Sequence, residues 1–191
     1  MKNNKLCRIL LLLAFLTGAL IACSRSPHSS SGEGMTEVTI NNLTITNLKQ
    51  IYILLRLATG EGDTFPISLG ELAKDSVNSN LFVCPGTGHD AGSMRTVEEW
   101  TDYIYVGSQP ELCVADAALV ISPPENYGGK YGIVLFAAGY ISKLSADQVR
   151  LLVEKPWLLA SNAPRADLDQ LKKTINVRVP KWLQPYYSKV N

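Results

Sequence analysis

A short apolar run lies close to the start of the chain and is followed by a polar stretch. Residues 1–8 carry three basic side chains and no acid, and the 14 residues 9–22 carry no charge. A helix that crosses a bilayer needs about 20 apolar residues, so this run is too short to be a comfortable span. A basic segment before a short apolar core is typical of a secretory signal, and we expect residues 1–22 to be removed.

Residues 23–34 contain no large apolar side chain and are rich in Ser and Gly. Such a composition cannot build a core, so we expect this segment to be a tether.

Helical spacing of apolar residues begins after the tether. Over residues 41–59 these positions are Ile45, Leu48, Ile51, Tyr52 and Leu55. The spacing predicts a helix that begins at an Asn in 41–42 and ends before Gly60. Because Val38 and Ile40 alternate with polar residues, a strand at the start of this segment is the competing interpretation.

The remaining pattern alternates between short strands and helices. Segments rich in β-branched and aromatic residues predict strands at 81–83, 103–106, 118–121, 131–136 and, after a turn at 138–139, at 140–141. Ser68 with Glu71 forms a capping box for a short helix over 69–75, and Ser145 with Gln148 forms another. The second box opens a helix with Val149, Leu152 and Val153 on one face, and Leu168, Leu171 and Ile175 predict a further helix.

This order of elements predicts an α+β fold in which an N-terminal helix packs on a small antiparallel sheet. We expect the domain to span residues 35–154 and to be followed by a C-terminal helical extension, residues 155–191.

The apolar run ends in Leu20-Ile21-Ala22-Cys23, which resembles the lipobox of bacterial lipoproteins. The resemblance implies that signal peptidase II exposes Cys23, which carries a diacylglycerol thioether and is then N-acylated, for example with palmitate. Two or three acyl chains hold a protein on the membrane far better than one, since each buried CH₂ adds about 0.8 kcal/mol to the free energy of membrane binding. Ser24, where an Asp would favour inner-membrane retention, favours the outer membrane. An uncleaved anchor with an incidental Cys is the alternative.

An ordered series of short motifs follows: NLKQI (47–51), GDTFPISL (62–69), LFVCP (81–85), DYIYV (102–106), NYGG (126–129) and VLFAAGYI (134–141). Together they resemble the pseudopilin-like, type II secretion protein G-like domain of planctomycete and verrucomicrobial proteins. The resemblance implies one long helix packed on a small antiparallel sheet, which agrees with the periodicity.

The chain departs from that family in several places. Typical members begin with a prepilin site and a filament-forming apolar helix, whereas this chain has a lipobox and a tether. The family carries His where this chain has Tyr127 and Tyr140, and Asp where it has Ala138. Tyr is a poor metal ligand at neutral pH because its pKa is about 10. The implied protein is an envelope-anchored relative of pseudopilins that has lost filament assembly.

Charge and composition give little sign of a charged partner. The chain has 18 basic and 17 acidic residues, and removal of residues 1–22 leaves 15 basic and 17 acidic ones. This balance argues against nucleic-acid binding through bulk charge. The two histidines, at 28 and 89, leave little room for a His-rich metal site.

Cys84 and Cys113 are the thiols of the predicted domain. Export would place them in an oxidising compartment, where a disulfide between them would close the loop 85–112. Such a bridge would stabilise the fold by about 3–4 kcal/mol in the chain-entropy treatment. Two buried, unpaired thiols are the alternative.

Candidate chemistry is sparse. Cys84 and His89 are the residue types of a nucleophile and its base, but the sequence identifies no third group to orient the His. Glu98, Glu99 and Asp102 form an acidic cluster of the kind that binds calcium, although a solvated surface is the simpler expectation. We therefore predict no catalytic residue, no cofactor and no metal site.

The C-terminal tail combines aromatic and basic side chains. Trp182, Tyr186 and Tyr187 follow a segment rich in Lys and Arg. Three interpretations are open: the tail lies on anionic lipid headgroups, it docks a partner, or it packs back on the domain with its basic face in water. We favour the third.

Taken together, the sequence predicts a lipid-anchored cell-envelope protein that faces the periplasm or the cell surface. Its domain would be structural or interaction-based rather than enzymatic, with a link to a secretion or pilus-like system and an envelope protein as partner. The alternative is a periplasmic lipoprotein that binds a small ligand or acts as an assembly factor. Its pocket would be built from Tyr103, Tyr105, Tyr127 and Tyr140.

Overall fold

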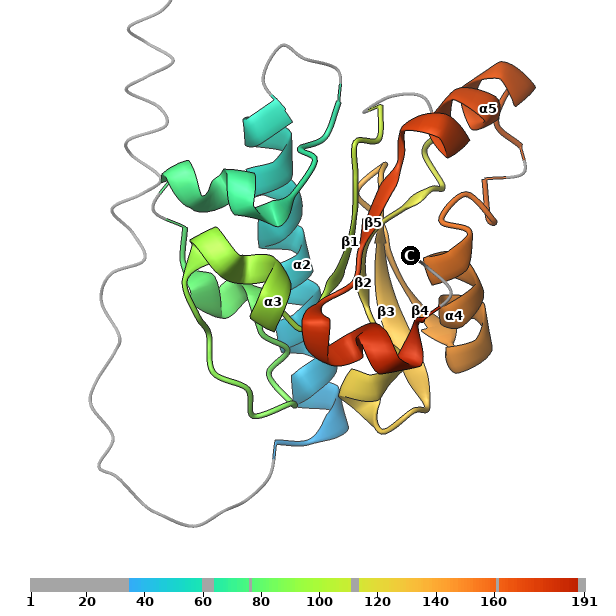
Figure 1. The fold of residues 1–191 in the computed structure, drawn as a ribbon. Helices are drawn as coiled ribbons and strands as arrows, with labels where there is room; N and C mark the ends of the chain where they lie inside the picture. Colours follow the sequence, from blue (N-terminus) through green and yellow to red (C-terminus); the bar gives the residue numbers. More distant parts are fainter. Residues whose placement is uncertain (1–34, 60–63, 76, 111–113, 161, 189–191) are drawn as a thin grey trace, which may run out of the picture. The chain divides into compact units, whose positions relative to one another are not determined.

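The described part of the chain is an α+β fold around a five-stranded antiparallel sheet (Figure 1), as predicted. The computed structural model describes residues 35–59, 64–75, 77–110, 114–160 and 162–188. The predicted signal, the lipidation site Cys23 and the tether lie outside these residues.

The sheet has the strand order β4-β3-β2-β1-β5, and each neighbouring pair is antiparallel. Four of the five strands expected from the sequence correspond to a meander in chain order: β1 (Ile104–Gly107), β2 (Ala118–Ser122), β3 (Tyr131–Phe136) and β4 (Ile141–Ser145). β4 shares only its first residue with the predicted strand at 140–141 and continues to Ser145. β5 (Asn176–Arg178), which the sequence did not predict, pairs with the other edge of β1. The predicted C-terminal extension therefore supplies a strand of the sheet.

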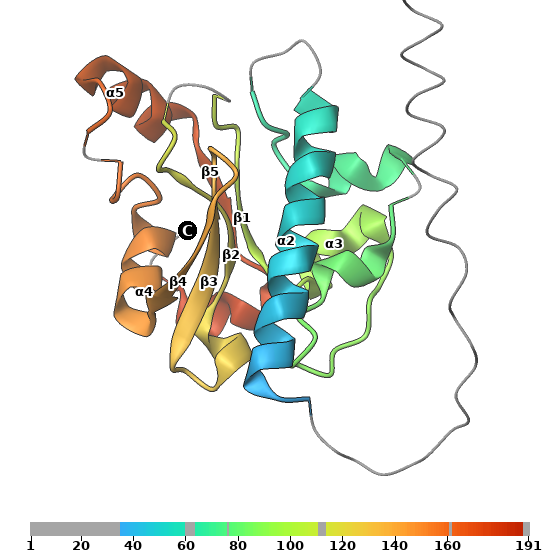
Figure 2. The same ribbon diagram turned by 180° about the vertical axis from the view of Figure 1, so that it is seen from behind.

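Helices cover both faces of the sheet (Figures 1 and 2). α2 (Glu37–Thr59) packs on one face, where Tyr103 and Tyr105 join its core. α4 (Ala146–Glu154) packs on the other face with the neighbouring side chains, Ile104 and Val106. Successive residues of a strand point to opposite faces, so β1 contributes to two apolar cores at once.

Shorter elements complete the fold. They are the 3₁₀ helices η1 (Leu69–Asp75), η2 (Ser79–Phe82), η3 (Met94–Thr96), η4 (Pro124–Tyr127) and η5 (Lys181–Tyr186), and the α-helices α3 (Val97–Trp100) and α5 (Arg165–Thr174). No helix in the described ranges is long and apolar enough to cross a membrane.

α2 ends at Thr59 as expected but begins at Glu37, four residues before the predicted start. Thr36 caps it, because its Oγ1 accepts a hydrogen bond from the backbone N–H of Thr39 at 3.3 Å. The alternation at Val38 and Ile40 that suggested a strand is therefore part of the first helical turns, and that interpretation is wrong.

The predicted strand at 81–83 is also wrong, since η2 occupies most of it. Asn78 opens η2 by accepting a hydrogen bond from the N–H of Asn80 at 3.1 Å. Asn and Ser side chains offer the backbone such local bonds in place of a sheet ladder. The carbonyl oxygen of Phe82 instead accepts a bond from the N–H of Asp102 at 3.0 Å.

The two capping boxes differ in how fully they form. Both halves are present at Ser145 and Gln148, where α4 begins. At η1, the carboxylate of Glu71 accepts a bond from the N–H of Ser68 at 3.3 Å, which is the Glu half of the box.

Gly107, at the end of β1, is a position where a side chain does not fit. An added Cβ would approach the carbonyl oxygens of Ile67 and Pro66, the second to 2.8 Å. We expect Gly107→Ala to lower the free energy of unfolding by about 1–3 kcal/mol, because backbone rather than a flexible side chain must move. Urea unfolding would measure the loss.

Gly70→Ala is the matched control, since its nearest neighbour would be a side-chain oxygen at 3.5 Å. Equal stability of the two variants would contradict the close packing of β1 against residues 66–67.

Candidate functional site

Asp102 accepts hydrogen bonds from three donors although its side chain is fully buried. Its Oδ2 lies 2.8 Å from the backbone nitrogen of Cys84 and 2.6 Å from Oγ1 of Thr87. Its Oδ1 lies 2.6 Å from Nδ1 of His89. We call these four residues the Asp102 cluster. Since one buried carboxylate holds all three donors, the cluster fixes the turn at 84–89 against the start of β1.

The backbone of Asp102 is tied to a third segment. The carbonyl oxygen of Asp102 accepts a bond from Nδ2 of Asn126 at 2.9 Å. That amide also donates to Oγ of Ser122 at 3.0 Å, and this hydroxyl lies 2.8 Å from the hydroxyl of Tyr127. The cluster thus connects the turn, β1 and η4.

The thiol of Cys84 is buried, and its side-chain contacts are with Thr44 and Tyr127 rather than with His89. Its Sγ lies 3.6 Å from Oγ1 of Thr44 and 3.9 Å from the hydroxyl of Tyr127. Burial raises the pKa of this thiol, which disfavours the thiolate that nucleophilic chemistry requires. Cys113 lies outside the described residues, so the disulfide between the two stays a prediction.

The structure provides the orienting group for His89 that the sequence did not reveal, namely Asp102. The side chain of His89 is 44% exposed, and its ring packs edge-on against Trp182 with centroids 5.0 Å apart. The His is thus held between a buried acid and an indole. The ring of His89 is oriented as a general base requires, but the Cys84 thiol is not placed to act as its nucleophile.

The predicted acidic cluster does not come together. Asp102 is fully buried, so the expectation that it lies on a solvated surface is wrong. Glu98 turns instead toward Arg178, with 3.8 Å between Oε2 and Nη1. Among the described residues, no group of three or more His, Cys, Asp or Glu is placed to hold a metal ion.

The four tyrosines proposed as a pocket also separate. Tyr103 and Tyr105 are fully buried in the core beneath α2, and Tyr127 joins the same core. Tyr140 is 41% exposed and stacks on Phe136. They do not line a common cleft in the part of the chain that is described.

The aromatic tail packs back on the domain. Trp182 donates from Nε1 to the carbonyl oxygen of Thr101 at 3.0 Å. Tyr187 is buried, and its hydroxyl lies 2.9 Å from Oε2 of Glu125. Of the three aromatic residues in η5 and the residue after it, Tyr186 is the exposed one.

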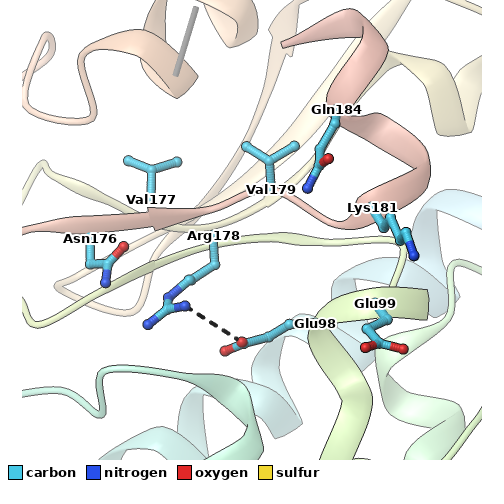
Figure 3. A pocket seen from close by; sticks show the side chains of 8 residues that line it. All are labelled: Glu98, Glu99, Asn176, Val177, Arg178, Val179, Lys181 and Gln184. Atoms are coloured by element: carbon cyan, nitrogen blue, oxygen red, sulfur yellow. Dashed lines mark ion pairs between the residues drawn. The ribbon is translucent and has the colours of Figure 1, made fainter. Parts of the chain in front are cut away.

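A groove of about 400 Å³ follows β5 (Figure 3). Its lining comes from three elements: Glu98 and Glu99 of α3, residues 176–179 along β5, and Lys181 and Gln184 of η5. We call this the β5 groove. Figure 3 shows Asn176 and Arg178 on the side of α3, while Val177 and Val179 point the opposite way.

The β5 groove contains two polar atoms that lack partners. Glu98 Oε1 and Arg178 Nε are buried, and neither forms a hydrogen bond with any residue that the structure describes. An unsatisfied buried polar atom costs about 1–3 kcal/mol. The residues of this groove are far apart in the sequence, which indicates an acidic pair at 98–99 and a basic tail that includes Arg178 and Lys181, but not that the two meet.

A smaller pocket of about 240 Å³ lies at the start of α2, next to Tyr127 and Tyr131. Lys143 already covers the ring of Tyr131, with Nζ 3.4 Å from its centroid, and pairs with Glu37 at 3.2 Å. Of the residues that line this pocket, Asn126 has one buried oxygen, Oδ1, without a hydrogen-bond partner among the described residues, against two such atoms in the β5 groove.

Comparison with known proteins gives no relative: no protein-family model, no curated protein and no solved structure matches this chain.

Proposed function

We propose that this chain is a lipid-anchored protein of the bacterial cell envelope whose domain binds a partner and performs no catalysis. The observation that carries the proposal is the sequence Leu20-Ile21-Ala22-Cys23 at the end of a basic and apolar leader. The domain resembles pseudopilins in the order of its elements, since one long helix, α2, precedes an antiparallel meander. We infer a structural role, linked to a secretion or pilus-like system.

Two features of the site support a role without catalysis. The three donors around Asp102 join the turn at 84–89 to the sheet, which is what a stable scaffold requires. The raised pKa of the Cys84 thiol disfavours a covalent mechanism. The β5 groove supplies a surface for a partner, which the alternative role as an assembly factor would also use.

Cys23→Ala tests the anchor. We expect the variant to lose all incorporated palmitate and to leave the membrane fraction, because the thioether and the acylated amine both depend on that residue. Radiolabelled palmitate followed by fractionation measures both effects.

Cys7→Ala is the matched control, since Cys7 lies in the segment that we expect to be removed, and it should label like the native chain. Persistence of the label in the Cys23→Ala protein would overturn the proposal.

A further inference from the structure

We propose that the β5 groove binds an extended peptide segment of a partner protein, which adds a strand to the sheet beside β5. This inference rests on the proposed function as an interaction domain and names the kind of partner. Its occupant is a polypeptide in β conformation rather than a small anion, a cation or a second folded copy of this chain.

β5 lies at the edge of the sheet. Within the described residues, β5 pairs with β1 on one side, and no strand pairs with its other side. An edge strand offers backbone N–H and C=O groups to an incoming chain. Three residues at about 3.4 Å each give an edge of about 10 Å, enough for a short main-chain ladder.

The surface around that edge is recessed. α3 and η5 both contribute to the lining, so β5 lies in a recess rather than on a projecting rim (Figure 3). A single extended chain enters such a recess, whereas the edge of a second folded domain would meet its walls. This favours a flexible segment of a partner over self-association.

The lining of the groove combines balanced charges with two unpaired polar atoms. Two acids, Glu98 and Glu99, are balanced by Arg178 and Lys181, so the groove does not select a strongly charged ligand. Glu98 Oε1 needs a donor and Arg178 Nε needs an acceptor. An amide carries both, and the two side chains, 32% and 38% exposed, have room to turn toward it.

The two sides of β5 also define a pattern for the peptide. Side chains on one side of an added strand would meet Glu98 and Arg178, and those on the other would meet Val177 and Val179. Alternate residues of the bound segment should therefore be polar and apolar.

The experiment uses the full-length chain in detergent micelles as bait for a random dodecapeptide library displayed on phage. We expect enrichment of peptides that alternate polar and apolar residues. In a synthetic copy of the best binder, N-methylation should weaken binding about tenfold or more at every second position and be tolerated between them. This period of two is the signature of a strand ladder and needs no variant of the protein.

Arg178→Ala then locates the site, and it should also weaken binding about tenfold. Arg150→Ala is the matched control, because Arg150 also lies 3.8 Å from a glutamate, Glu125, outside the groove. Circular dichroism establishes that the Arg178→Ala and Arg150→Ala proteins are folded. Gln184→Ala, on the groove wall, is a second variant that tests the same site.

Three results would each overturn the proposal: no enrichment of any peptide, an N-methyl scan without alternation, or a dimer in solution that Arg178→Ala dissolves. Each is read on purified protein without reference to palmitate. Failure of the groove is thereby distinguished from failure of the lipid anchor.

Discussion

Asp102→Ala is expected to lower the free energy of unfolding by about 3–5 kcal/mol, because three buried or half-buried donors lose their shared acceptor. The backbone N–H of Cys84 has no water to turn to, since its residue is buried. In a domain of this size the loss corresponds to a melting temperature lower by roughly 10 °C or more. Calorimetry and urea unfolding would measure it.

Asp90→Ala provides the control, since Asp90 is an exposed acid in the same loop. We expect its effect on stability to stay within about 0.5 kcal/mol. If the Asp102→Ala and Asp90→Ala proteins had the same melting temperature, the buried carboxylate would not hold the turn at 84–89. The account of the Asp102 cluster would then be wrong.

Alkaline unfolding is the second large expected effect. Burial raises the pKa of Tyr103, Tyr105, Tyr127 and Tyr187 above the ordinary value. Above about pH 10 the unfolded chain releases these protons while the native chain keeps them, so stability falls as pH rises. Four such groups remove about 5–6 kcal/mol per pH unit, and the raised pKa of Cys84 acts in the same direction.

Because a domain is stable by about 5–15 kcal/mol, we expect cooperative unfolding about one to three units above pH 10. Phenolate absorbance and circular dichroism should change together. Tyr103→Phe should reduce the slope by about 1.4 kcal/mol per pH unit, because one group with a raised pKa is removed. Gradual ionisation without unfolding would contradict the burial of these phenols.

Much of the fold follows from local pattern. α2 ends where Gly60 was expected to stop it, and α4 begins at the capping box of Ser145. β1, β2 and β3 are apolar runs that are buried throughout, so their burial shows in the sequence. Such elements are predictable because propensity, capping and periodicity agree within one segment.

β5 was missed for the opposite reason. Residues 176–178 are too few to show a period, and each is only partly buried. What makes them a strand is the ladder with β1, about 70 residues earlier, and no local window contains that information.

The site was harder to predict than the fold. Asp102 follows Glu98 and Glu99, and this acidic neighbourhood suggested a solvated surface rather than burial. The useful signal was its place directly before the apolar run of β1. Glu98 and Arg178 meet only because β5 returns to the sheet. A groove made of residues 80 positions apart has no signature in either segment alone.

The late position of β5 has a consequence for biogenesis. One flank of β1 cannot be closed until residues 176–178 have been synthesised, about 70 residues after β1 itself. Until then the sheet lacks its fifth strand. For the exported protein that we propose, such a delay favours threading of the unfolded chain through a translocation channel over premature folding on the side of synthesis.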